Sequence, residues 1–437
     1  MEDLHFRAAG GESQPQPITY NFVIPMPTAS VIPLSFGEVL RITVMRRVFY
    51  AQVVSLFGDF LALFAVIAVV SFRMHGTPAQ LTGLQIAYML PIVFVGPIAG
   101  VFVDRWPIKP TLITSDLLRA GLALLLLPAT SIWQIYGVLA ALSCVSAFFG
   151  PAQTVTIRSH VPIAGLMSAN ALMQIAFMGS RIVGPSIAGV LVGRFTPRVC
   201  YAIDVLSFLI SAALIASVAI VRPASLAAPT ASSTNRIHQI WVDMKAGWSF
   251  IVHHSAILFF VVAMAAGLFT IGCFGPLISI YVRDALRADA GLFGYVSGMV
   301  GVGLLIGTQL IRQIARKPWA SDTGLVLSGL FGIGAGVLLL GAVPHLVATF
   351  AATFIIGFAF ASIMVPASTL IQRETPPDML GRVGSTNASV IFLGQILGVA
   401  VSGVLAGLVG VRTVFFLCAG LSVALAAGGR LFLQSKK

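Results

Sequence analysis

Charged side chains inside strongly apolar segments are the residues of this sequence best placed to do chemistry. Asp59 lies about twelve residues into such a segment, roughly 18 Å along a helix that rises 1.5 Å per residue. An ionised carboxylate at that depth in a membrane costs about 2.5–3.5 kcal/mol. This acid could exchange a proton between two conformations or contact a substrate. The alternative is a structural hydrogen bond to a neighbouring helix.

Four other charged residues share this setting. Arg181 is similarly deep, and because an arginine does not readily lose its proton, it needs a carboxylate, carbonyl groups or an anionic substrate. Pairing with Asp59 is one candidate, and both a functional and a purely structural role stay open. Asp116 and Arg119 are three residues apart and can neutralise each other on one helix face. We interpret this pair, together with Asp204, as a supporting charge network.

The segments that position these residues are membrane-spanning helices. Apolar residues make up 58% of the chain and charged residues only 9%, which indicates a polytopic membrane protein. Stretches long enough to cross about 30 Å of hydrocarbon recur a dozen times. We expect spans at 48–72, 81–103, 110–130, 132–156, 168–193, 199–221, 256–282, 291–312, 323–343, 346–371, 383–408 and 411–433.

The two halves of the chain are copies of each other. Residues 151–193 return as 366–407 with an offset of 215 that slips to 214. At the same offset Asp59 meets Cys273 and Asp204 meets Cys418, so the interior acids belong to the first copy alone. Parallel repeats in one membrane chain are typical of a transporter whose two bundles rock about a site near the midplane.

Basic residues predict the orientation of the chain. Of the 26 Lys and Arg, 18 fall on the side of the two termini, 6 on the opposite side and 2 inside helices. The positive-inside rule therefore places both termini in the cytoplasm, in a multi-pass protein of the inner (cytoplasmic) membrane. The net charge of +12 is explained by this orientation and by anionic lipid headgroups, and we expect no nucleic-acid partner.

We expect an all-α membrane protein with twelve transmembrane helices in two six-helix bundles. A flexible cytoplasmic tail at 1–40 precedes the first bundle, at 41–221. A linker at 222–255, whose second part has the apolar spacing of an interfacial amphipathic helix, leads to the second bundle at 256–433. The start of the chain lacks the pattern of a removable signal peptide.

Several function classes are disfavoured. The sequence lacks the phosphate-cradling loop of an ATP-driven pump. Its seven histidines fall in loops, the tail or helix ends, and its four cysteines have no ligand spacing, so we expect no enzyme, no catalytic residue, no metal and no cofactor. The two-bundle repeat is asymmetric and has a single buried acid, Asp59, in the expected cavity. This favours alternating access over a channel, which would have a ring of identical pore residues.

A family resemblance rests on short motifs. Gly100-Val-Phe-Val-Asp104-Arg105-Trp-Pro-Ile-Lys109 resembles the loop after the second helix that marks the major facilitator superfamily. Within it the chain is similar to the drug:proton antiporter branch that includes the enterobactin exporter and macrolide efflux proteins. Further matching residues are Gly58-Asp59, Leu90-Pro91, Gly96-Pro97, Ser115-Asp116-Leu-Leu-Arg119, Pro151-Ala152, Gly184-Pro185 and Asp204-Val-Leu-Ser-Phe208.

The resemblance assigns roles to these motifs. It implies that Gly100, Asp104, Arg105 and Lys109 form a gating loop on the cytoplasmic side. It also implies that the run from Gly184-Pro185 to Gly189 is the antiporter-type motif of the fifth helix, with Ala188 where a glycine is usual. One departure is that 132–157, the fourth span, lacks the arginine found there in drug:proton antiporters.

Together these features predict a secondary active exporter of an amphipathic small molecule, such as a drug, macrolide or siderophore, in exchange for protons. The alternative is a facilitator of the same fold that imports a solute or flips a lysolipid-like substrate. Expected partners are the substrate, protons and membrane lipids. The sequence leaves the oligomeric state open and favours a monomer.

Overall fold

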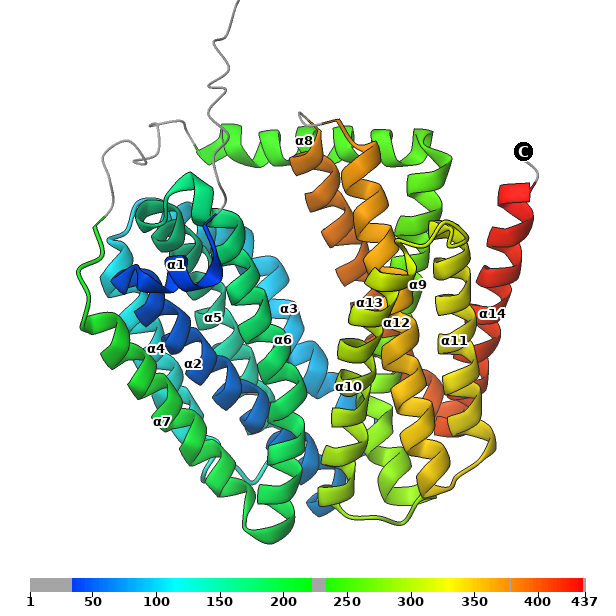
Figure 1. The fold of residues 1–437 in the computed structure, drawn as a ribbon. Coiled ribbons are helices and arrows are strands. Elements are labelled where there is room, and N and C mark those ends of the chain that lie inside the picture. Colours follow the sequence, from blue (N-terminus) through cyan, green and yellow to red (C-terminus); the bar gives the residue numbers. More distant parts are fainter. Residues whose placement is uncertain (1–33, 222–232, 377–378, 435–437) are drawn as a thin grey trace, which may run out of the picture.

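The computed structural model describes residues 34–221, 233–376 and 379–434, and these ranges contain helices and no strands. The helices form two bundles side by side (Figure 1). The first contains α2 (Thr43–Ala68), α3 (Pro78–Val103), α4 (Ile108–Leu124), α5 (Ile132–His160), α6 (Ile163–Arg194) and α7 (Pro197–Ala216). The second contains α9 (Ser255–Ile280), α10 (Ala290–Ile314), α11 (Asp322–Ala342), α12 (Leu346–Glu374), α13 (Leu380–Val409) and α14 (Val411–Gln434). The expected fold class is confirmed.

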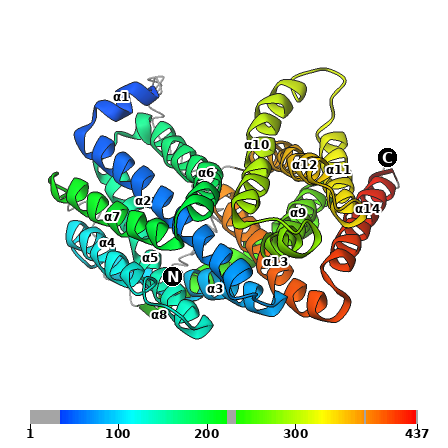
Figure 2. The same ribbon diagram turned by 90° about the horizontal axis from the view of Figure 1, so that it is seen from below.

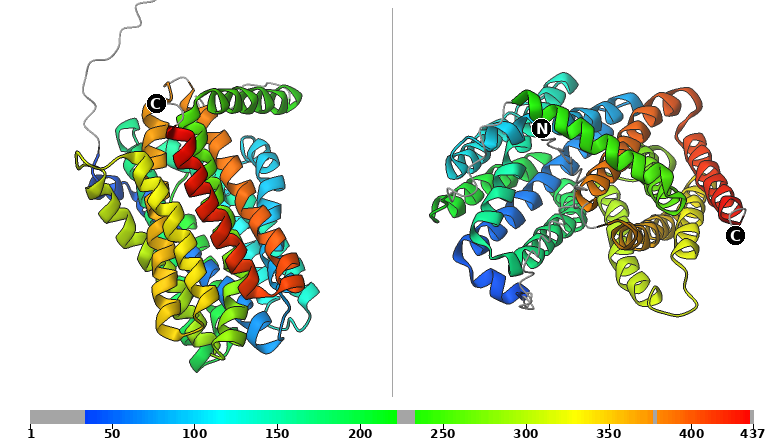
Figure 3. Two further views of the ribbon diagram at one scale, coloured as in Figure 1. Left: turned by 90° about the vertical axis from the view of Figure 1, so that its right-hand side faces the viewer. Right: turned by 90° about the horizontal axis from the view of Figure 1, so that it is seen from above.

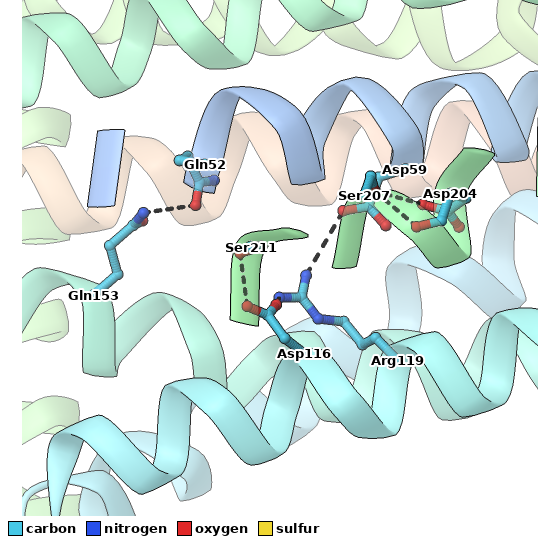
Figure 4. Close-up of polar contacts among 8 residues, drawn as sticks. All are labelled: Gln52, Asp59, Asp116, Arg119, Gln153, Asp204, Ser207 and Ser211. Atoms are coloured by element: carbon cyan, nitrogen blue, oxygen red, sulfur yellow. Dashed lines mark hydrogen bonds and ion pairs between the residues drawn. The ribbon is translucent and has the colours of Figure 1, made fainter. Parts of the chain in front are cut away.

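Within the described ranges, eleven helices are long and apolar enough to cross a membrane. The remaining bundle helix, α4, has 17 residues and is about 26 Å long at 1.5 Å per residue. It is also less apolar than its neighbours because it carries the buried residues Asp116 and Arg119. Both side chains point into the first bundle (Figure 4). Although α4 is short, it packs against α5 and α7.

The duplication is visible in an unusual backbone feature. α2 continues into a π-helical turn, η1 (Val69–Arg73), and α9 continues into η3 (Tyr281–Ala285), 212 residues later. Each turn is followed by a residue with positive φ, His75 at 49° and Arg287 at 51°. Because this left-handed conformation is uncommon for residues other than glycine, its recurrence at the same offset indicates a shared local fold of the two copies.

Two further helices, α8 and the short α1, lie outside the bundles. α8 (Ser233–His253) runs across one end of the molecule, which we name the α8 end (Figures 1 and 3). It is attached to α13 by an ion pair of 2.9 Å between the Arg382 Nε and the Asp243 Oδ1. Residues 222–232 of the expected linker at 222–255 lie outside the described part of the chain. The side chains of residues 237–241, which belong to the expected apolar face, lie outside it too.

The last part of the expected flexible tail is helical. α1 (Phe36–Arg41) begins with a capping box in which the Ser35 hydroxyl and amide N–H both donate to the Glu38 carboxylate and hold its pKa below its usual range. Val39 is fully buried, and the Leu34 amide donates to the Ala164 carbonyl of α6 at 3.1 Å. These contacts explain why residues 34–41 are ordered, and residues 1–33 lie outside the described part.

The bundles touch each other at the end opposite α8. There the Arg283 Nη1 donates to the carbonyls of Ser71 and Gly76 at 2.6 and 3.1 Å. Nearby, the rings of Phe64 and Phe293 stack with centroids 4.5 Å apart. Seen from this end, α6 of the first bundle lies beside α10 of the second (Figure 2). Toward the α8 end the two bundles diverge (Figure 1), and the α3 side chains Phe94 and Ile98 are 66% and 55% exposed.

Candidate transport site

Four of the five interior charges of the first bundle form one cluster (Figure 4). Asp116 and Arg119 on α4 make an ion pair, as the three-residue spacing predicts. Ser211 of α7 donates its hydroxyl to the other Asp116 oxygen at 2.6 Å. Asp116 is fully buried and Arg119 is 4% exposed, so this pair is shielded from water. Shielding strengthens the attraction between the two charges and makes losing either partner costly.

Aromatic rings complete the enclosure of Arg119. Its guanidinium carbon lies 4.5 Å from the ring centroids of both Phe149 of α5 and Phe208 of α7. A cation between two ring faces is stabilised by both quadrupoles, and desolvation strengthens that attraction. The Arg119 Nε is buried without a hydrogen-bond partner among the described residues. Arg119 is therefore held in place by three different helices.

Asp59 of α2 is also part of this cluster. Its Oδ2 lies 3.7 Å from the Arg119 Nη1, an ion pair that is too long for a good hydrogen bond. The Asp59 side chain is 20% exposed, in contrast to Asp116 behind it. Asp59 is therefore the carboxyl of this cluster that water or a ligand can reach most easily. The partner suggested by the sequence, Arg181, does not form this ion pair.

Asp204 supplies a third carboxyl to the cluster. It is 1% exposed, and its Oδ1 is 3.5 Å from the Ser207 hydroxyl, which donates more closely to the Asp204 backbone carbonyl at 2.7 Å. The carboxyl lies against α2 at Gly58, where an added Cβ would be 2.8 Å from the Asp204 Oδ1. The small residue before Asp59 thus lets α7 bring a second acid close to it.

Arg181 stands apart from this cluster. It is exposed on α6, and no hydrogen bond or ion pair joins it to another residue in the described ranges. An electrostatic interaction connects it with the phenol of Tyr88 on α3. Tyr88 is also within electrostatic range of Asp59, Asp204 and Arg119. Tyr88 cannot be recognised as a site residue from the sequence, because a tyrosine in an apolar helix looks like an ordinary packing residue.

This arrangement of two six-helix repeats can be compared with known proteins. The model of the Major Facilitator Superfamily matches residues 48–389 and, in a second alignment, 267–437. The chain belongs to the major facilitator superfamily. Its members are transporters and not enzymes, so the expectation that this protein is a transporter is confirmed.

Named relatives of this major facilitator protein include efflux proteins. The chain is 27% identical over 389 residues to the uncharacterized MFS-type transporter YfiS of Bacillus subtilis (strain 168), covering 89% of this chain and 92% of that one. It is 25% identical to macrolide efflux protein A of Streptococcus pyogenes, covering 80% and 86%. A bacterial homologue of the human lysosomal transporter Spinster, solved in an inward-facing and occupied conformation, superposes with a TM-score of 0.69 at 11% identity, covering 91% and 97%.

The loop that suggested the superfamily lies at the α8 end. Asp104 is the C-cap of α3, and Gly100 has open space where a Cβ would be. Arg105 is exposed, whereas the Lys109 Nζ donates to the Ala216 carbonyl at the end of α7 at 2.7 Å. Lys109 therefore joins two helices of the same bundle. A role of the loop as a gate between bundles stays a prediction.

The motif of the fifth span, in contrast, forms part of the contact between bundles. A Cβ on Gly189 would be 2.7 Å from the Gly294 Cα of α10, and a Cβ on Gly294 would be 2.8 Å from the Pro185 carbonyl. Gly184 packs against the Phe60 side chain of α2 within the first bundle. Small residues at these positions let the α6 and α10 backbones touch, as close helix crossings in membranes require.

Proposed function

We propose that this protein is a secondary active exporter of an amphipathic small molecule, driven by protons that enter the cell through the Asp59 cluster. The observation that carries the proposal is a charge imbalance. Three carboxyls, those of Asp59, Asp116 and Asp204, share one cluster with a single guanidinium, that of Arg119. In an apolar interior, unpaired ionised carboxylates are expensive, so protons are the natural further cations of this cluster.

Within the cluster, Asp59 is best suited to exchange its proton. Asp116 already has both an arginine and the Ser211 hydroxyl as partners. Asp204 is almost completely enclosed, whereas Asp59 is 20% exposed and holds its arginine partner at 3.7 Å. A change in the distance between Asp59 and Arg119 would change how strongly Asp59 holds a proton, which is the coupling that an antiporter needs.

Alternating access is supported by where the bundles touch. The contacts of Arg283 and of Gly189 with Gly294 all lie at the end opposite α8. With both termini in the cytoplasm, as the basic residues indicate, that end faces outward and the structure is open to the cytoplasm. Separation at Gly189 and closure at the α8 end would expose the site to the outside.

Export, rather than import, is favoured by the relatives. Macrolide efflux protein A and the multi-drug resistance efflux pump PmrA of Streptococcus pneumoniae, which is 24% identical, are both named for efflux. Proton entry can drive such efflux, because one charge that moves inward is worth about 2.3 kcal/mol per 100 mV.

Purified protein in liposomes tests the proposal. We expect an inside-acid pH gradient to drive accumulation of at least one probe from a panel of erythromycin, ethidium and dansylglycine. Asp59→Asn should abolish accumulation but retain exchange of the probe at equal pH on both sides, since substrate binding would persist. Asp322→Asn, which removes an acid at the first residue of α11, is the matched control and should retain both activities. Gradient-driven accumulation by Asp59→Asn at the wild-type rate would refute the proposal.

A further inference from the structure

The two arginines inside the first bundle have opposite surroundings. Arg119 is 4% exposed and is enclosed by Asp116, Asp59 and two aromatic rings. Arg181 is exposed, and none of the described residues forms an ion pair or a hydrogen bond with it. Because guanidinium groups stay charged, Arg181 leaves an uncompensated cation in the middle of a membrane helix.

Arg181 is too deep to reach lipid phosphates. It lies 13 residues, about 20 Å, from the Arg194 end of α6 and 18 residues, about 27 Å, from the Ile163 end. Arginines that snorkel to the headgroups are found near helix ends. Lipid headgroups therefore do not account for this charge.

Arg181 belongs to a polar face of α6. Asn170, Gln174 and Arg181 are separated by four and seven residues, so they lie on one side of the helix, and all three are exposed. The exposed residues on the other side, Val183 and Ile187, are apolar, as expected for a lipid-facing surface. A polar helix face in a membrane protein faces a bundle interior or a water-filled space.

Contacts around Arg181 show what this polar face looks toward. Phe177, one turn before Arg181, meets the Phe60 ring of α2 with centroids 5.6 Å apart. The polar face of α6 is thus turned toward α2, which carries the partly exposed Asp59.

None of the acids in the described part of the chain forms an ion pair with Arg181. In the twelve bundle helices, the described acids away from helix ends are Asp59, Asp116 and Asp204, and Arg119 lies among them. The described acids of the second bundle all lie at helix ends or in η3: Asp284, Asp289, Asp322 and Glu374. The described residues of the opposing bundle therefore offer no interior counter-ion.

We infer that Arg181 is the anion-binding position of the substrate site and that the transported amphiphile carries a carboxylate or a comparable acidic group. This inference rests on the proposed function and gives its substrate a charge. A guanidinium binds a carboxylate through two parallel hydrogen bonds, which supplies orientation as well as affinity. Asn170 and Gln174 along the same face add neutral donors and acceptors for the polar part of the substrate. A fixed cation at this position also disfavours substrates with a positive charge at the same place.

Three fluorescent probes that share one apolar group test this inference. Dansylglycine carries a carboxylate, dansylglycinamide is its neutral amide, and dansylethylenediamine carries an ammonium group at neutral pH. Binding to purified protein is measured by equilibrium dialysis at one pH, without a gradient. The wild type should bind dansylglycine at least tenfold more tightly than either other probe. Arg181→Gln should reduce that preference to within twofold, and Arg181→Lys should retain an intermediate preference.

Matched controls separate a lost site from a damaged fold. Arg194→Gln removes an arginine from the end of the same helix and should leave the tenfold preference intact. Unchanged binding of dansylglycinamide by Arg181→Gln shows that this variant is folded. A wild type that binds the amide or the ammonium probe as tightly as the carboxylate would overturn the inference, as would a preference that survives in Arg181→Gln. Neither result bears on proton coupling, which is measured separately with Asp59→Asn under a pH gradient.

Discussion

Replacing Arg119 by methionine should strongly destabilise the first bundle. The substitution keeps an unbranched apolar stem between Phe149 and Phe208, so most of the packing survives. It leaves Asp116, which is fully buried, without its cation. Breaking a buried pair by removing one partner costs about 3–5 kcal/mol, most of which comes from the charge left behind. We therefore expect a loss of that size in the free energy of unfolding.

A second substitution identifies the origin of this loss. Asp116→Asn in the Arg119→Met background removes the stranded carboxylate, and we expect it to recover about half of the lost stability or more. Unfolding in mixed detergent micelles at increasing dodecyl sulfate measures the three free energies. Arg158→Met, at the exposed end of α5, serves as the control and should change stability by less than about 0.5 kcal/mol. If Arg119→Met were as stable as the wild type, or if the double variant were no more stable than Arg119→Met, the ion pair of Asp116 and Arg119 would not be the source of the stability loss.

Two other predictions concern helix contacts. Gly58→Ala should cost about 1–3 kcal/mol of stability in the same unfolding assay, because its Cβ would overlap the Ser207 hydroxyl, whereas Gly121→Ala, which meets open space, should be tolerated. Equal effects of the two substitutions would contradict the packing of α2 against α7. Arg283→Gln should weaken the contact between bundles, since hydrogen bonds of a charged donor contribute about 1.5–3 kcal/mol. Spin labels at Met74 and Tyr295 should then show a larger population of long distances, and an unchanged distance distribution would exclude Arg283 as a latch.

Local sequence rules predict the elements of this protein but not the pairing within its charge cluster. The hydrophobic length of each span and the three-residue spacing of Asp116 and Arg119 are properties of a single helix, so they can be read directly. The ion pair of Asp59 with Arg119 joins helices whose residues are 60 positions apart, and it depends on how α2 and α4 pack in three dimensions. By charge alone, Arg181 is as suitable a partner for Asp59 as Arg119 is. Only the packing of the helices distinguishes the two arginines.

The duplicated halves show why the chemistry belongs to one bundle. The positions equivalent to Asp59 and Asp204 hold Cys273 and Cys418, two buried free cysteines of the same hydrophobic core. The same helix packing therefore brings two acids together in the first copy and two thiols together in the second. Thiols tolerate an apolar interior without a counter-ion, whereas the acids require Arg119 and protons. Under the proposed function, proton binding would act on the first bundle, while the second contributes residues such as Gly294 and Arg283 that contact it. A transporter built in this way needs a single set of interior charges, because the movement of one bundle relative to the other is enough to change which side of the membrane those charges face.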